Sequence, residues 1–178
     1  MGTQNDASRV TGRLLQGLTA SRLASQGAPL EGSAAPVRPV SFLLDTNVVS
    51  EWTKPRPNPG VVEWLAQVEE DEVFLSVVTI AELRHGIERL PAGERRRRLD
   101  EWLRSDLALR FEGRIIGVDG AIADEWGRMI ARREARGRPM GAMDALVAAT
   151  AQVHDLTVVT RNATDFQATA KSVLNPWT

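Results

Sequence analysis

Short apolar runs alternate with longer segments of helical period along the chain from residue 40 onward. Apolar runs of four to six residues are typical of buried strands, whereas apolar positions that recur every three or four residues are typical of helices. We expect strands at 41–44, 73–78, 114–118 and 156–160, and a short edge strand near Val173. Strands that alternate with helices predict an α/β fold with a central parallel β-sheet flanked by α-helices.

The expected helices carry start and stop signals of their own. Asn58 followed by Pro59 is a favourable N-cap and first-turn pair, and an apolar stripe follows it. A second helix is expected to begin near Thr79 and to end before Pro91. The remaining helices are expected at 92–109, 119–135 and 143–154.

The first 39 residues differ from the rest of the chain. They are rich in Gly, Ser, Ala, Gln and Pro, and they lack the apolar periodicity that packing needs. We expect 1–39 to be a disordered N-terminal extension and 40–178 to be one domain, because 178 residues are too few for two ordinary domains.

Composition narrows the chemistry. The chain has no Cys and only two His, so any metal must be held by oxygen. Its formal net charge of -1 does not mark it as a nucleic-acid binder. Arginines gather at 95–98 and between 128 and 138, as phosphate-binding groups or simply as solvated helix faces. No apolar run approaches the roughly 18 residues of a membrane span, which predicts a cytoplasmic protein without membrane contact.

Four acids follow strands or open helices in this pattern. Asp45 ends the first strand, and Asp165 lies shortly after the strand at 156–160. Glu82 follows the strand that ends near Val78, and Asp144 opens a helix of small residues. Because the carboxyl ends of parallel strands meet at one edge of a sheet, we expect these four carboxylates to lie together.

Each acid taken alone also has an ordinary structural explanation. Asp45 and Asp165 could be turn or cap residues, and Asp144 could be a first-turn acid. Thr79 and Glu82 have the spacing of a capping box, in which the Glu reaches back to a backbone N–H. A coincidence of all four at one sheet edge is much less expected than any one of them.

Four neighbouring carboxylates require a counter-charge. Two carboxylates about 4 Å apart repel by roughly 4 kcal/mol at an effective dielectric near 20. A divalent cation relieves that repulsion, and ligation by oxygen alone favours Mg²⁺ or Mn²⁺. Such ions, held by few carboxylates, usually serve phosphate chemistry, so the acids indicate a metal site for that chemistry.

Four segments together resemble the PIN-domain toxins of the VapC and FitB type. They are Phe42 to Glu51 (Phe-Leu-Leu-Asp-Thr-Asn-Val-Val-Ser-Glu), Ser76 to Gly86, Met143 to Ala151, and a closing segment with Thr160-Arg161-Asn162, Asp165-Phe166 and Asn175-Pro176-Trp177. The resemblance covers residues 41 to 178 in the family order. The extension before the first strand departs from it, because family members usually start immediately before that strand.

The resemblance implies a PIN fold and RNA cleavage with Mg²⁺ or Mn²⁺ at Asp45, Glu82, Asp144 and Asp165. It also implies a homodimer, a higher toxin–antitoxin complex, and inhibition by a small antitoxin whose tail enters the acidic pocket. Some relatives place the fourth acid at the position of Asn162, which we expect to line the pocket here while Asp165 supplies the acid. The expected positioning residues are Thr46, Asn47 and Thr160 for water or a phosphate oxygen, and Arg84 and Arg138 for the RNA backbone.

Three other functions compete with this interpretation. A haloacid-dehalogenase-like phosphatase needs a second Asp two residues after the first, where this chain has Asn47. A receiver domain needs adjacent acids early and a Lys late in the sheet, which the chain lacks. A noncatalytic module that captures a basic peptide in the acidic pocket stays open on sequence alone.

Overall fold

Five parallel strands form one sheet in the order β3-β2-β1-β4-β5. The computed structural model describes residues 40–177, so the segment 1–39, expected to be a disordered extension, lies outside the described residues. The strands are β1 (Phe42–Leu44), β2 (Val73–Ser76), β3 (Ile115–Ile116), β4 (Thr157–Val159) and β5 (Val173–Leu174). Each lies at an expected position, and the prediction of a parallel α/β sheet is confirmed.

Successive side chains of the central strand enter two different cores, because a strand turns alternate residues to opposite faces. Leu44 packs with Val159 on one face, whereas Leu43 packs with Val158 on the other. All four are fully buried. Both faces are therefore covered, which leaves the ends of the strands as the place where polar groups can gather.

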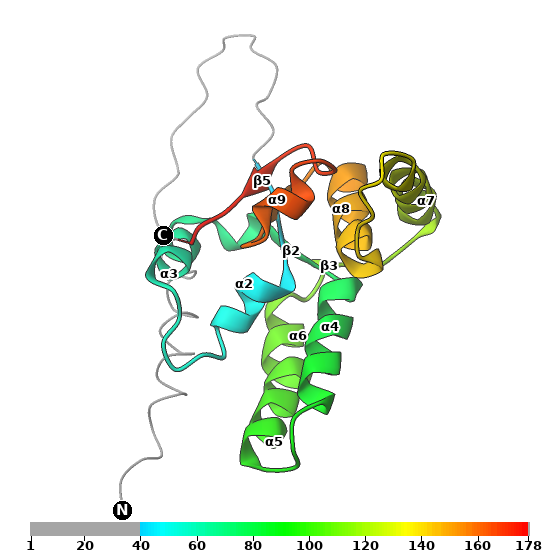
Figure 1. Ribbon diagram of the computed structural model, residues 1–178. Coiled ribbons are helices and arrows are strands. Elements are labelled where there is room, and N and C mark those ends of the chain that lie inside the picture. Colours follow the sequence, from blue (N-terminus) through cyan, green and yellow to red (C-terminus); the bar gives the residue numbers. More distant parts are fainter. Residues whose placement is uncertain (1–39, 178) are drawn as a thin grey trace, which may run out of the picture.

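Helices cover both faces of the sheet (Figure 1). They are α2 (Thr46–Glu51), α3 (Pro59–Gln67), α4 (Val77–Glu88), α5 (Glu94–Glu101), α6 (Ala108–Arg110), α7 (Gly120–Ala135), α8 (Ala142–His154) and α9 (Ala163–Phe166), with a 3-10 turn η1 (Glu70–Glu72) and a π-helical segment η2 (Trp102–Leu107). The core on one face takes side chains from α2, α3, α4 and η2, and the core on the other from α7, α8 and α9 together with Val78 at the start of α4.

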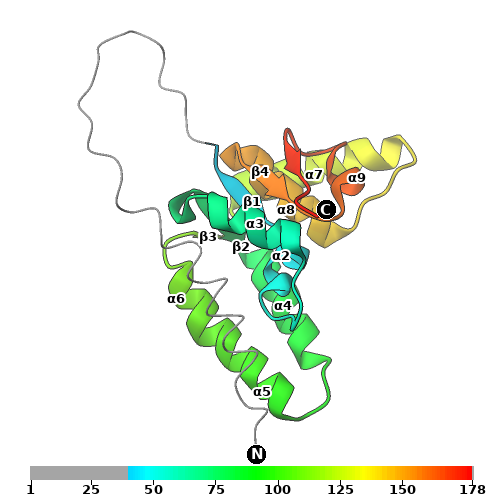
Figure 2. The same ribbon diagram turned by 90° about the vertical axis from the view of Figure 1, so that its left-hand side faces the viewer.

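A helical hairpin projects from the sheet. In both views α4 runs beside the continuous helical stretch formed by α5, η2 and α6, and the far end of the pair lies well away from the strands (Figures 1 and 2). The sequence predicted a single helix at 92–109, but it begins at Glu94 and contains the π-helical turn of η2. The described helices include none long and apolar enough to cross a membrane.

The helix α2 was not expected. Its six residues include the adjacent β-branched Val48 and Val49, which lower helix propensity. Both are fully buried, together with Trp52 just after the helix, so tertiary packing holds the turn where propensity alone would not. The consequence is that Asp45 becomes the N-cap of a helix as well as the last residue before it.

Candidate functional site: a cluster of four carboxylates

Asp45 lies at the carboxyl end of β1 and is 5% exposed. Its Oδ1 accepts a hydrogen bond from the backbone N–H of Thr46 at 2.7 Å, which caps α2. Its Oδ2 accepts from the hydroxyl of Thr160 at 2.6 Å and from the amide of Asn47. The cap interpretation and the site interpretation of Asp45 therefore hold together, because one oxygen caps the helix while the other belongs to a side-chain network.

Thr160 joins the two sides of this network. It directly follows β4, and its hydroxyl oxygen accepts from the Asn47 amide at 3.1 Å and from the backbone N–H of Asn162 at 3.0 Å. The Asn47 carbonyl oxygen in turn accepts from the backbone N–H of Arg161 at 3.1 Å. The first turn of α2 and the loop after β4 are thus fixed to each other beside Asp45.

Glu82 lies inside α4, one turn from its start. The carboxylate accepts from the hydroxyl of Thr46, which brings it to the same edge as Asp45. The expected capping box with Thr79 is wrong, because Ser76 is the N-cap and its hydroxyl accepts from the N–H of Val78. Thr79 instead donates to the carbonyl of Leu44 on β1, which ties the start of α4 to the central strand.

Asp144 lies in the first turn of α8, as expected for either a first-turn acid or a site residue. The small side chains that follow it, among them Ala145, Ala148 and Ala149, are fully buried against the sheet. A β-carbon added at Gly141, the N-cap of α8, would lie 3.2 Å from an Asp144 carboxylate oxygen. The glycine therefore leaves the room that this carboxylate occupies.

The fourth side of the cluster comes from α9. Asp165 is exposed in the first turn of this helix and lies near enough to Asp144 to raise the pKa of that carboxyl. Asn162, at the N-cap position of α9, is exposed too, and its backbone N–H donates to Thr160. Both positions lie beside the site, and the electrostatic contact with Asp144 favours Asp165 as the fourth acid.

Burial and mutual repulsion raise the pKa values of two acids in the cluster, which disfavours the fully ionised state. Burial raises the pKa of Asp45, and the nearby Glu82 raises it further, while hydrogen bonds from Thr160, Thr46 and Asn47 partly offset the rise. Burial raises the pKa of Asp144 as well, with added repulsion from Asp45 and Asp165. The two carboxyl groups thus lack a positive neighbour strong enough to outweigh burial.

The residues of this site offer the oxygen ligands that a divalent cation prefers, but they do not form a complete coordination shell by themselves. Among residues 40–177, no three His, Cys, Asp or Glu side chains converge closely enough to hold an ion between them as they stand. Mg²⁺ typically retains several waters and uses only one or two protein carboxylates. The all-oxygen set of Asp45, Asp144, Glu82 and Asp165 fits a partly hydrated ion of that kind.

Comparison with known proteins places this geometry in a family. A family model described as "PIN domain" matches residues 42–172, which is most of the chain. The chain belongs to the PIN-domain family. Toxin FitB of Neisseria gonorrhoeae is 40% identical to it over 136 residues, which are 76% of this chain and 98% of FitB. The VapC ribonuclease Y4jK of Sinorhizobium fredii is 33% identical over 136 residues, 76% of this chain and 97% of the relative.

A solved structure agrees with these PIN-domain relatives. The crystal structure of FitAcB from Neisseria gonorrhoeae matches with a TM-score of 0.72 and 40% identity, over 76% of this chain and 98% of that one. The predicted PIN fold is therefore confirmed.

The structure directs Arg84 away from the acids of this PIN domain. Its guanidinium pairs with Asp100 across the helical hairpin and lies 3.6 Å from Glu88 one turn along α4. Arg138 is exposed in the loop between α7 and α8. A role for either side chain in holding RNA stays a prediction.

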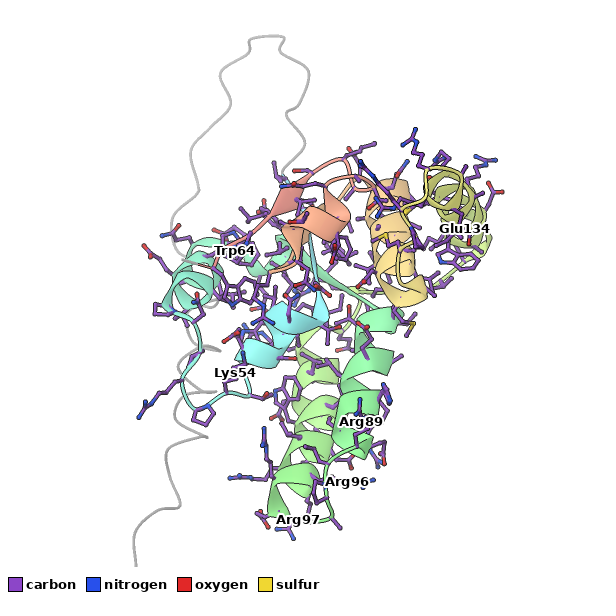
Figure 3. All side chains as sticks on the ribbon, viewed as in Figure 1. Lys54, Trp64, Arg89, Arg96, Arg97 and Glu134 are labelled. Carbon is purple, nitrogen blue, oxygen red and sulfur yellow. The ribbon has the colours of Figure 1, made fainter. Side chains whose placement is uncertain are left out.

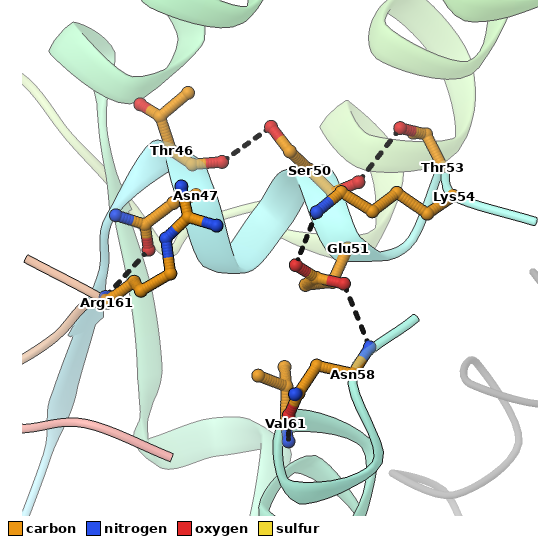
Figure 4. Close-up of polar contacts among 9 residues, drawn as sticks. All are labelled: Thr46, Asn47, Ser50, Glu51, Thr53, Lys54, Asn58, Val61 and Arg161. Carbon is orange, nitrogen blue, oxygen red and sulfur yellow. Dashed lines mark hydrogen bonds and ion pairs between the residues drawn. The ribbon is translucent and has the colours of Figure 1, made fainter. Parts of the chain in front are cut away.

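Sequence reasoning missed one buried acid, Glu51, at the end of α2. Its side chain is 3% exposed, pairs with Lys54 at 2.6 Å and accepts from the backbone N–H of Asn58 at 3.0 Å (Figure 4). It also accepts a hydrogen bond from the Trp177 side chain. Although burial acts to raise the pKa of Glu51, these partners outweigh it and lower the pKa. Its place in a run with Val48, Val49 and Trp52 was the available signal for a helix face that faces inward.

Proposed function

We propose that this chain is a Mg²⁺- or Mn²⁺-dependent endoribonuclease and the toxin of a type II toxin–antitoxin system. The observation that carries the proposal is the electrostatic proximity of Asp45 to Glu82, and of Asp144 to both Asp45 and Asp165, with the pKa values of Asp45 and Asp144 raised. Membership of the PIN-domain family and relatives named toxin FitB and VapC ribonuclease support the choice of RNA.

Asp45 and Asp144 would hold the cation directly, and Glu82 and Asp165 would complete its surroundings directly or through water. When bound, a divalent cation lowers the pKa of an attacking water and neutralises the charge that develops on the phosphate. Burial of Asp45 keeps bulk water from competing for its free oxygen lone pairs. The raised pKa values of Asp45 and Asp144 mean that protons compete with the cation for these carboxylates up to a higher pH than usual, so affinity for the metal rises with pH over that range.

The polar neighbours would orient the reacting groups. Thr160 and Asn47 fix the Asp45 carboxylate through hydrogen bonds to Oδ2, which sets the direction of the remaining lone pairs. Thr46 does the same for Glu82. Asn162 carries an exposed amide beside this network and would contact water or a phosphate oxygen. Together these side chains would orient the substrate phosphate and the attacking water for displacement at phosphorus.

A small antitoxin is the proposed partner, together with a second copy of the chain in a homodimer and a higher toxin–antitoxin complex in the cytoplasm. The uncompensated pocket supports the mode of inhibition. A guanidinium inserted among Asp45, Asp144 and their neighbours would supply the missing positive charge through charge-assisted, bidentate hydrogen bonds. Antitoxin and divalent cation are therefore expected to compete for one pocket.

The decisive experiment is an RNA-cleavage assay with and without Mn²⁺, on the wild-type chain and on Asp45→Asn. Asp106→Asn is the matched control, because Asp106 is exposed on η2 and carries the same change of charge. Cleavage that requires Mn²⁺, persists in the control and disappears in Asp45→Asn is the expected result. Metal binding without RNA cleavage would instead indicate another metal-dependent phosphohydrolase or a noncatalytic acidic-pocket module.

A further inference from the structure

The residue beside the acid cluster that the proposed chemistry has not used is Arg161. It directly follows Thr160, whose hydroxyl donates to Asp45, so its backbone lies one residue from the network around the site. Its side chain is exposed. Figure 4 shows this side chain beside Asn47 at the first turn of α2.

The backbone of Arg161 is held on both sides. Its backbone N–H donates to the side-chain oxygen Oδ1 of Asn47 at 3.1 Å. Its backbone carbonyl oxygen accepts from the side-chain amide of Asn175 at 3.4 Å. Asn175 is in turn held by the N–H of Trp177, which donates to its carbonyl oxygen at 3.0 Å. The side chain therefore starts from a fixed point, which reduces the conformational entropy that it loses on binding a ligand.

Several other arginines of the described chain are already paired with acids. Arg96 and Arg97 bind Glu88 and Glu94 at the far end of the hairpin, where Figure 3 shows them well away from the sheet. Arg161 forms no ion pair with any acid of residues 40–177, although Asn47 and Thr160, which it adjoins, both hydrogen-bond to Asp45. Since no acid of the described residues pairs with this exposed guanidinium, its N–H donors are available to an external anion.

We propose that Arg161 binds a phosphate of the RNA chain next to the scissile bond, a role that rests on the proposed function. A guanidinium offers two parallel N–H donors to phosphate oxygens, which fixes orientation as well as position. Without such a group, the acidic edge repels the RNA backbone wherever metal does not neutralise it. Arg161 thus supplies the substrate-binding role that the sequence assigned to Arg84.

The test compares Arg161→Ala and Arg161→Lys with Arg95→Ala, a control that removes one exposed positive charge near the start of α5. Michaelis parameters for a labelled single-stranded RNA are measured in Mn²⁺. Because the bond forms in both ground and transition states, Arg161→Ala should raise KM about tenfold with little change in kcat. The KM of Arg161→Lys should lie between those of wild type and Arg161→Ala, since Lys keeps the charge but loses the two parallel N–H donors. The KM of Arg95→Ala should match that of wild type.

A second measurement needs no catalysis. Fluorescence anisotropy of the same RNA in EDTA, across a range of salt concentrations, should show a slope of log affinity against log salt reduced by about 0.7 in Arg161→Ala, the value for one lost phosphate contact on a single strand. Mn²⁺ affinity by calorimetry and the melting temperature should be unchanged, which separates phosphate binding from a structural role. An unaltered KM and salt slope would overturn the proposal for Arg161, whatever happens to kcat. A wild-type chain that neither binds nor cleaves RNA would instead overturn the proposed function itself.

Discussion

Two buried carboxylates stand at opposite ends of one short helix, and their pKa values shift in opposite directions. Asp45 caps the start of α2 and is 5% exposed, and Glu51 ends the helix and is 3% exposed. Burial raises the pKa of Asp45 and is not fully offset by its hydrogen bonds. Burial acts in the same direction on Glu51, but the ion pair and hydrogen bonds to that residue prevail and lower its pKa.

The two acids differ in their partners. Glu51 has a cation, Lys54, and donors from Asn58 and Trp177. Asp45 has neutral donors only, and its charged neighbour Glu82 is another acid. A buried acid that is paired with a cation serves the fold. A buried acid without such a partner can instead be stabilised by a positively charged ligand. The following substitutions test that distinction.

The largest effect is expected for Asp144→Asn, because Asp144, at the start of α8, has a raised pKa like that of Asp45. The substitution removes a proposed metal ligand, so RNA cleavage should fall by at least roughly 100-fold. The free energy of unfolding should hold or rise, because burial and repulsion from Asp45 and Asp165 disfavour the charge that is removed. Cleavage assays and urea unfolding measure the two quantities. A large loss of stability together with normal cleavage would make Asp144 a structural acid rather than a metal ligand.

On the compensated side, Glu51→Gln should do the opposite. It keeps the volume of the side chain but removes the charge that Lys54 and the Asn58 N–H contact at 2.6 and 3.0 Å. Hydrogen bonds to charged groups contribute about 1.5–3 kcal/mol each, and the exposed end of Lys54 lowers its share, so we expect a loss of about 2 kcal/mol in the free energy of unfolding. Mn²⁺ affinity, measured on the folded variant, should stay within a few-fold of wild type.

The pH dependence of stability should separate Glu51 from Asp144, whose pKa is raised like that of Asp45. The folded pKa of Glu51 lies below its ordinary value of 4.5, so its contribution is present above that pH and is lost as the pH falls through the folded pKa. The folded pKa of Asp144 lies above 3.8, so its contribution is present below that pH and is lost as the pH rises through the folded pKa. Urea unfolding from pH 3 to 8 should therefore show the deficit of Glu51→Gln growing with pH, and Asp144→Asn gaining on wild type over the same range.

The acid cluster could be predicted from the sequence because the prediction depends on topology alone. The carboxyl ends of parallel strands lie at one edge of the sheet, and Asp45 and Asp165 follow strands β1 and β4. The sequence-based prediction failed where an ion-pair or hydrogen-bond partner comes from an element that is distant in the sequence. In the sequence Arg84 has no evident partner, but in the folded hairpin it pairs with Asp100. Thr79 has the spacing of a cap until β1 offers it the Leu44 carbonyl. Glu51 depends on Trp177 at the other end of the described chain, a contact that no local pattern contains.

The smallest expected effect concerns the room around Asp144. In Gly141→Ala the new β-carbon would stand 3.2 Å from the Asp144 carboxylate oxygen, so the carboxylate must give way by a few tenths of an ångström. The backbone there, at φ -59° and ψ 141°, accepts alanine without strain, and the loss of glycine freedom in the unfolded chain should stabilise the fold by about 0.4–1 kcal/mol.

Activity should nevertheless fall, by roughly three- to tenfold, because a displacement of about 1 Å at a catalytic group can cost about 100-fold and this one is smaller. Gly127→Ala is the matched control, since Gly127 lies within α7 and an added β-carbon there meets nothing within 4 Å. It should gain stability to a similar extent and cleave RNA at the wild-type rate. Equal rates in both variants would mean that the exact position of the Asp144 carboxylate is not critical and that only its charge matters.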